Sequence, residues 1–183
     1  MKLLFTTAFI ILSAAYPINA SWETSYDIDR GNNVGLYPSM QIQTDNESDN
    51  VTLHITYYDA EQTELKYARV QNGEVKSMFE MDYWENAGKY NSLALDSKGC
   101  LHISYYDEDN GSLKYIFYDT RWLFKKTLLD SAGDVGLYTS IVVDAEDRPH
   151  ISYYDKSHGY LEYYNGATGQ ASVVDNEIGR AHV

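Results

Sequence analysis

Apolar and polar residues alternate in short runs along most of this chain, and a period of two predicts β-strands rather than helices. One such run occurs three times with nearly the same letters, as LHITYYD, LHISYYD and PHISYYD. Successive copies begin 48 residues apart. Self-similarity at a fixed period of roughly 40–50 residues is typical of repeat folds, so we treat the chain as a repeat. The three copies are Leu53–Asp59, Leu101–Asp107 and Pro149–Asp155.

Each repeat resolves into four short segments with strand character, joined by turns rich in Gly, Asn and Asp. In the second repeat we expect strands at Ser92–Asp96, Leu101–Asp107, Ser112–Tyr118 and Trp122–Asp130. Four antiparallel strands at this period predict an all-β protein of three four-stranded, β-propeller-type blades. An open β-solenoid and a single sandwich are the alternatives. These alternatives explain the sequence less well, because a solenoid rung is usually shorter than this period and a sandwich does not require a sequence motif that recurs at a fixed spacing.

Two flanking segments extend the pattern beyond three repeats, which span about 30–82, 83–130 and 131–175. Trp22–Asp29 has the character of a fourth strand ahead of the first repeat, and 176–183 matches the start of a further, truncated one. Propellers usually have about four to eight blades. We therefore expect either an incomplete ring or a ring that a second copy completes, as a six-bladed homodimer.

The second repeat carries a resemblance to a known class of repeats. Ser92–Asp107 and Gly111–Tyr115 resemble, almost position by position, the tandem Tyr-rich propeller repeats of exported bacterial proteins, with their HISYYD and GxLKY phrases. The turn at Asp96–Gly99 is similar to the turns of NHL-type propellers. The resemblance covers 22–175 and implies a propeller fold. It implies no single activity, because a fold of this kind hosts many unrelated functions.

The beginning of the chain has the pattern of a secretory signal peptide. Lys2 precedes the apolar run Leu3–Tyr16, and small residues follow. This order predicts a signal peptide at Met1–Ala20 and a mature domain at 21–183, with cleavage after Ala15 as the alternative. We expect an exported protein, secreted or periplasmic, with no membrane span after cleavage.

Charge and motif content narrow the function classes. The chain has 14 Lys+Arg against 27 Asp+Glu, a net charge of −13, which repels phosphate backbones and argues against nucleic acid as a partner. No Gly-x-Ser-x-Gly elbow, converging arginine set or distinct carboxylate pair occurs, so we predict no catalytic residue and no cofactor. A propeller-class hydrolase and a truncated remnant without independent function are the alternatives to a binding or scaffold module.

Three histidines recur at one position of the repeat: His54, His102 and His150. Equivalent residues of neighbouring blades face each other across packed sheets about 10 Å apart. Zinc ligands instead all lie about 2 Å from one ion. We therefore expect each histidine to make structural hydrogen bonds within its own repeat, and we predict no metal site.

The best candidate for ligand binding is the end of the blades where a Gly-x-Tyr-x-Ser segment meets the Tyr-Tyr-Asp phrase. A tyrosine ring beside a carboxylate suits a saccharide, since the ring stacks on C–H groups and the carboxylate accepts from hydroxyls. Repetition would give several weak sites that act by avidity on a glycan or another exported protein. The alternative is structural: the tyrosines pack between blades and the aspartates cap turns. The predicted residues are Tyr37, Tyr90, Tyr138, Tyr58, Tyr106, Tyr154, Asp59, Asp107 and Asp155.

Overall fold

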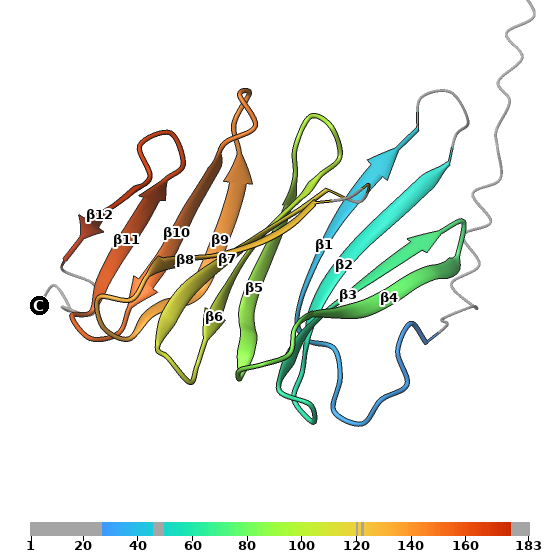
Figure 1. The fold of residues 1–183 in the computed structure, drawn as a ribbon, viewed down its shortest axis with the longest axis horizontal. Coiled ribbons are helices and arrows are strands. Elements are labelled where there is room, and N and C mark those ends of the chain that lie inside the picture. The colour runs from blue at the N-terminus through green and yellow to red at the C-terminus, as the bar shows by residue number, and fades with distance from the viewer. Residues whose placement is uncertain (1–26, 46–49, 120, 122, 177–183) are drawn as a thin grey trace, which may run out of the picture.

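The computed structural model describes residues 27–45, 50–119, 121 and 123–176. These residues form twelve strands in three four-stranded antiparallel sheets, which confirms the all-β prediction (Figure 1). None of them lies in a helix, so the described chain has no helix that could cross a bilayer. Each sheet contains one repeat, and its strands pair in chain order. The three sheets stand next to one another and are not closed into a ring.

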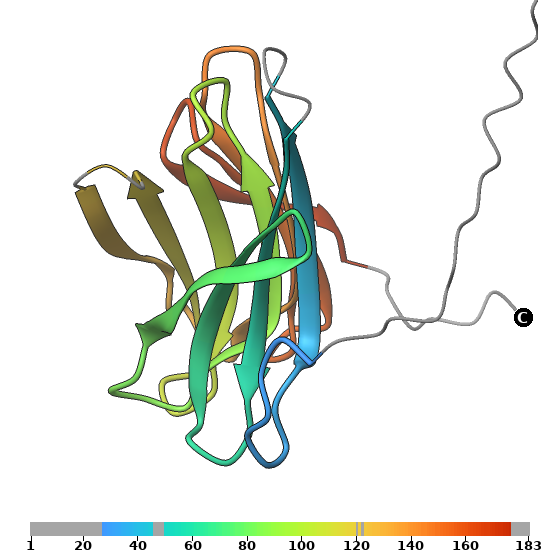
Figure 2. The same cartoon turned by 90° about the vertical axis from the view of Figure 1, so that its right-hand side faces the viewer.

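The sheets are named in chain order, and each begins with an inner strand that contacts the inner strand of the next sheet. Within each sheet the twist turns the outer strands away from the inner ones (Figure 2). Sheet 1 contains β1 (Leu36–Thr44), β2 (Val51–Asp59), β3 (Glu64–Gln71) and β4 (Glu74–Asp82). Sheet 2 contains β5 (Ala87–Leu95), β6 (Leu101–Asp107), β7 (Ser112–Asp119) and β8 (Leu123–Asp130). Sheet 3 contains β9 (Val135–Val143), β10 (Pro149–Asp155), β11 (Tyr160–Asn165) and β12 (Gln170–Asp175).

The inner strands differ from the sequence-based expectation at their beginnings. The sequence predicts the inner strand of the second repeat at Ser92–Asp96, with the Gly-x-Tyr segment in a turn, whereas β5 begins at Ala87 and includes that segment. The pairing of β5 with β6 shifts register here, and Tyr90 has a φ of 53°. A β-bulge therefore replaces the expected turn. Because the bulge interrupts the alternation of side chains, the start of this strand was not recognisable from the sequence pattern.

Several predicted segments lie outside the described residues. These are the signal peptide at 1–20, nearly all of the truncated repeat at 176–183, and Trp122 at the start of a predicted strand. Of the predicted strand Trp22–Asp29, only Asp27–Asp29 is described, and those three residues are not in a strand.

The hydrophobic core lies at the two junctions between sheets. At the first junction, Leu65 of β3 packs over Gly88 of β5, so a Cβ on that glycine would come within 2.8 Å of the leucine Cα. At the second junction Leu113 packs over Gly136 in the same way, at 2.7 Å. The glycine of the repeated Gly-x-Tyr motif is therefore required by the close approach of the preceding sheet.

Candidate ligand-binding site

Three equivalent tyrosines form a continuous row across the inner strands. Tyr37, Tyr90 and Tyr138 lie at the bulges of β1, β5 and β9. Their ring centroids are 4.6 Å apart for the first pair and 4.4 Å for the second, and both pairs are tilted by 52°. The two end members are exposed, Tyr37 to 38% and Tyr138 to 64%. We call these three residues the tyrosine row.

Every member of the tyrosine row has a left-handed backbone. The φ angles are 51° for Tyr37 and 53° for both Tyr90 and Tyr138. A bulky residue is rare in this region, where an L-residue other than glycine costs about 1–2 kcal/mol. Glycine or asparagine would avoid most of this strain. The same strained residue type at three equivalent positions is therefore a reason to look for a function in its side chain.

A second set of tyrosines supports the row from behind. Tyr58, Tyr106 and Tyr154 have ring centroids 6.2–6.4 Å from the corresponding row members. The hydroxyl of Tyr58 donates to Asn86 Oδ1 at 2.5 Å, and that of Tyr106 donates to Asp134 Oδ1 at 2.6 Å. Both acceptors belong to the start of the next repeat. Tyr58 and Tyr106 therefore connect neighbouring sheets. Their role is to hold the tyrosine row in position rather than to contact a ligand.

The predicted carboxylates are buried in turns. Asp107 Oδ1 accepts from the backbone N–H of Asn110 at 3.2 Å, and Asp59 and Asp155 accept from their own turns in the same way. All three side chains are buried. Lys114 also forms an ion pair with Asp107 at 2.5 Å. The structure therefore brings the predicted tyrosines together, and it gives the three aspartates the turn-capping contacts of the structural alternative.

The first tyrosine of each Tyr-Tyr pair points to the preceding repeat, opposite to the second. Its hydroxyl donates to the aspartate that ends the preceding fourth segment, at 2.6–2.8 Å. Burial and the nearby carboxylate raise the pKa of these tyrosines, so they remain donors. The sequence shows the aspartate at this position but not its pairing. The pairs are Tyr57 with Asp29, Tyr105 with Asp82 and Tyr153 with Asp130.

The three histidines join strands within their own sheets. A hydrogen bond links Nδ1 of His54 to the hydroxyl of Tyr67 at 2.8 Å, and the two other repeats have the same contact. The other ring nitrogen of His54 lies 3.1 Å from Gln43 Oε1. Burial, together with the charge of Arg69, lowers the pKa of His54 to about 4. Within the described chain no three His, Cys, Asp or Glu side chains are grouped to hold a metal ion.

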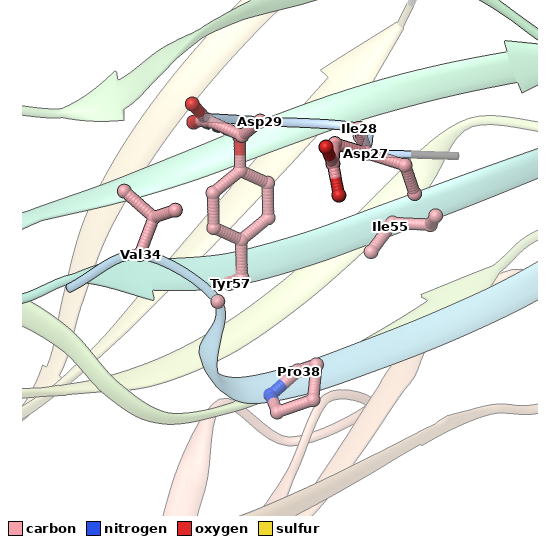
Figure 3. Close-up of a pocket in the computed structure, with 8 residues that line it drawn as sticks. Asp27, Ile28, Asp29, Val34, Pro38, Ile55 and Tyr57 are labelled. Atoms are coloured by element: carbon pink, nitrogen blue, oxygen red, sulfur yellow. Dashed lines mark hydrogen bonds between the residues drawn. The ribbon is translucent and has the colours of Figure 1, made fainter. Parts of the chain in front are cut away.

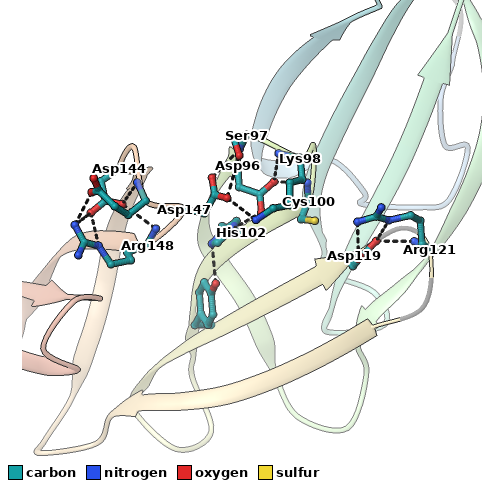
Figure 4. Close-up of polar contacts among 12 residues, drawn as sticks. Asp96, Ser97, Lys98, Cys100, His102, Asp119, Arg121, Asp144, Asp147 and Arg148 are labelled. Carbon is teal, nitrogen blue, oxygen red and sulfur yellow. Dashed lines mark hydrogen bonds and ion pairs between the residues drawn. The ribbon is translucent and has the colours of Figure 1, made fainter.

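A polar contact between turns joins sheets 2 and 3 (Figure 4). Asp147 accepts from the backbone N–H and the hydroxyl of Ser97, both at 2.9 Å, and from Lys98 Nζ at 2.7 Å. These contacts lower the pKa of Asp147 to about 2. The carboxylate thus stays ionised at neutral pH and connects the two turns.

Two cavities were not found from the sequence. The first, of about 330 Å³, lies against the outer face of sheet 1 and is lined in part by Val34, Ile55 and Tyr57 (Figure 3). The second, of about 390 Å³, is lined in part by the exposed pair Tyr83 and Trp84. That pair stands where the third repeat has Ser-Ala, and this contrast was the only sequence signal available.

Among the described residues, burial raises the pKa of two carboxyl groups, those of Glu64 and Glu162. Glu64 lies on β3 of sheet 1 and Glu162 on β11 of sheet 3, with sheet 2 between them (Figure 1). Neither lines either cavity. These two groups do not form the carboxylate pair of a glycoside hydrolase.

No family model and no curated protein matches the chain. The geometry of the tyrosine row and of the tyrosines packed against it is therefore the basis for inferring a function.

Proposed function

We propose that the three sheets are propeller-type blades of an exported protein and that the tyrosine row binds a saccharide chain. The blade assignment is supported by the four-stranded meanders, by their 48-residue period and by the contacts between successive inner strands. Export is supported by the signal-like pattern at Met1–Ala20.

The dimensions of the row favour one elongated ligand. Centroids 4.4–4.6 Å apart place neighbouring rings in contact, so the row is a continuous strip rather than three separate sites. Tyrosine rings stack on the C–H faces of sugars, and their hydroxyls both donate and accept. The net charge of −13 disfavours anionic polymers. A neutral oligosaccharide fits these properties best.

The observation that carries this proposal is the combination of backbone strain and exposure at Tyr138. Tyr138 is 64% exposed and its ring contacts Tyr90 of the neighbouring sheet on one side, so packing between sheets covers only part of this bulky residue at a φ of 53°. An exposed ring at a strained position is explained if the ring contacts a ligand.

The test is a calorimetric titration of the protein with neutral oligosaccharides. Tyr138→Asn removes the ring and keeps a residue that tolerates the left-handed conformation, so we expect binding to weaken about tenfold or more. Stability should stay equal or rise by about 1 kcal/mol, because strain is relieved. Tyr83→Asn is the matched control, since Tyr83 is exposed and lies outside the row.

Two results would contradict the proposal. One is a wild-type protein that binds no member of a broad glycan array. The other is an equal loss of affinity in Tyr138→Asn and Tyr83→Asn, which would place the ligand elsewhere or show a non-specific effect.

A further inference from the structure

Each internal junction buries one face of a sheet against the opposite face of the next sheet. At the two ends of the structure the equivalent faces have no neighbouring sheet among the described residues. On sheet 1, Met40 is 53% exposed, whereas its equivalent Leu93 in sheet 2 is 1% exposed against sheet 1. On sheet 3, Val142 is 62% exposed, whereas its equivalent Ala94 is 7% exposed against sheet 3. Each end therefore presents side chains whose counterparts are buried by a neighbouring sheet.

The two end faces are equivalent to the surfaces that pack together in the buried clusters at the internal junctions. The front face is the side of sheet 1 that faces away from sheet 2. Met40 and Ile42 are exposed on it, Val34 and Ile55 are half-buried, and Tyr57 is buried beside Asp29. The back face is the side of sheet 3 that faces away from sheet 2, formed by Val142, Leu161, Tyr163 and Val174.

We propose that the back face of one copy of this chain docks on the front face of a second copy, in the geometry of the internal junctions. The occupant is a second copy because the chain itself supplies both halves of this interface. Sheet 2 packs one of its faces on sheet 1 and the other on sheet 3, so faces of these two kinds are complementary. A front-to-back contact is heterologous and closes only if the rotation completes a ring. Among rings of about four to eight blades, six is the only multiple of three, so two copies close it.

The apolar groups match in position. At the internal junctions a leucine of β3 or β7 lies over the glycine of the next Gly-x-Tyr motif. The equivalent pair is Leu161 of one copy and Gly35 of the other. Gly35 lines the 330 Å³ cavity, and apart from its chain neighbours no heavy atom of the described residues lies within 4 Å of the point where its Cβ would be. Leu161 is only partly buried in the single chain, whereas its equivalents Leu65 and Leu113 are fully buried.

Two polar contacts of the internal junctions can also form between copies. Tyr58 and Tyr106 donate to the residue two before the next glycine motif, and Tyr154 would reach Asn33 of the second copy in this way. Ser39 Oγ accepts the N–H of Leu93 at 3.0 Å, a contact that Ser140 would make with the N–H of Met40. Asn33 is an amide, like the Asn86 that serves Tyr58.

The same docking would extend the tyrosine row. Tyr138 would lie next to Tyr37 of the second copy, as Tyr90 lies next to both of its neighbours. This consequence rests on the proposed function, because it lengthens the saccharide-binding strip. The association itself does not depend on any ligand.

Two mismatches make the interface weaker than the internal junctions. Pro38 stands where Asn91 and Thr139 hydrogen-bond to the preceding sheet, and proline has no donor. Asp29 already accepts from Tyr57, so Asp175 of the second copy would compete for that position. We therefore expect a dimer that dissociates on dilution, held by the inner strands rather than by the end of β12.

Sedimentation equilibrium of the full chain, without saccharide, tests the proposal. We expect twice the mass of one mature chain at high concentration. Val142→Asp should give a monomer, because it places a charge in the docked core. Val75→Asp is the matched control, since Val75 is also exposed but lies on β4, outside both faces. It should keep the dimer, and both variants should unfold like the wild type when diluted.

Pro38→Asn provides a test in the opposite direction. It restores the donor seen at Asn91 and should tighten dimerisation about tenfold. A wild-type chain that stays monomeric at its highest soluble concentration would overturn the proposal, as would a dimer unaffected by Val142→Asp. A mass that keeps increasing with protein concentration beyond that of a dimer would overturn the proposal that two copies close a ring. These outcomes are independent of saccharide binding, so failure here is distinguishable from failure of the proposed function.

Discussion

Sheets 2 and 3 contain nearly the same central strand, and the difference between them comes from their neighbours. LHISYYD in β6 is buried at all seven residues, whereas PHISYYD in β10 alternates between half-buried and buried. Ile151 and Tyr153, which face sheet 2, stay buried as their β6 equivalents do. Ser152 and Tyr154, on the opposite side, are half-buried. The phrase thus specifies a strand and its two faces, and the adjacent sheet determines how much of each face is buried.

This comparison makes equivalent positions useful as experimental pairs. The same substitution at equivalent positions of sheet 2 and sheet 3 removes the same side-chain atoms from sites that differ in burial. The difference in the free energy of unfolding then reports the contribution of the neighbouring sheet.

The largest expected difference is between Leu113→Ala in β7 and Leu161→Ala in β11. Leu113 is fully buried against the next sheet, so its truncation should lower the free energy of unfolding by about 3 kcal/mol. Leu161 is only partly buried in the single chain, and its truncation should cost about 1 kcal/mol. Urea unfolding of dilute protein measures both values.

The difference between these two variants should depend on protein concentration. If a second copy covers Leu161, the loss from Leu161→Ala should grow toward that of Leu113→Ala as the concentration rises, and Leu113→Ala should not change. Equal losses in dilute protein would show that burial in the single chain does not distinguish the two leucines.

A smaller difference is expected between Tyr105→Phe and Tyr153→Phe. Tyr105 donates to Asp82, which is fully buried, and its removal should cost about 2 kcal/mol because a buried carboxylate loses a donor. Tyr153 donates to Asp130, which is only partly buried and can be hydrated, so about 1 kcal/mol is expected. Thermal unfolding at neutral pH measures both, and a larger loss at Tyr153 would contradict the order.

The repeat made most of the architecture predictable from sequence. The period and alternation were enough for twelve strands in three sheets, because each repeat folds by local pairing of neighbouring strands. The bulge at Tyr90 was not predictable, since it depends on the approach of Leu65 to Gly88 from the preceding sheet. Local patterns contain no information about such an approach.

The spatial grouping of the candidate residues was predictable, but the different contacts that they make were not. The tyrosines and aspartates lie at one end of each sheet because the bulge of the first strand and the end of the second strand meet there. Which of them are exposed depends on stacking between sheets. Tyr106 donates to Asp134, 28 residues away, and Asp107 accepts from its own turn, whereas in the tyrosine row Tyr37 and Tyr138 are exposed and Tyr90 is half-buried between them.

The smallest expected difference concerns His54 and His150, which differ in burial and in the side chain beside Nε2. Nε2 of His54 faces the neutral Gln43, whereas Nε2 of His150 lies 2.9 Å from the carboxylate of Asp144. Burial lowers the pKa of His54 from 6.5 to about 4, so the unfolded chain takes up this proton first as the pH falls. The stability contributed by neutral His54 is therefore complete above about pH 6.5 and declines toward pH 4, by about 1 kcal/mol per pH unit.

Gln43→Asp places a carboxylate at the position equivalent to Asp144, beside Nε2 of His54. A carboxylate beside Nε2 favours the protonated ring, so the pKa of His54 should rise and the loss of stability between pH 6.5 and 5 should shrink by about 1 kcal/mol. Gln43→Asn is the control, because it has the same size without the charge. NMR titration of the His54 ring gives the pKa, and urea unfolding at the two pH values gives the stability. An unchanged pKa in Gln43→Asp would show that desolvation, rather than the side chain beside Nε2, sets the pKa of His54.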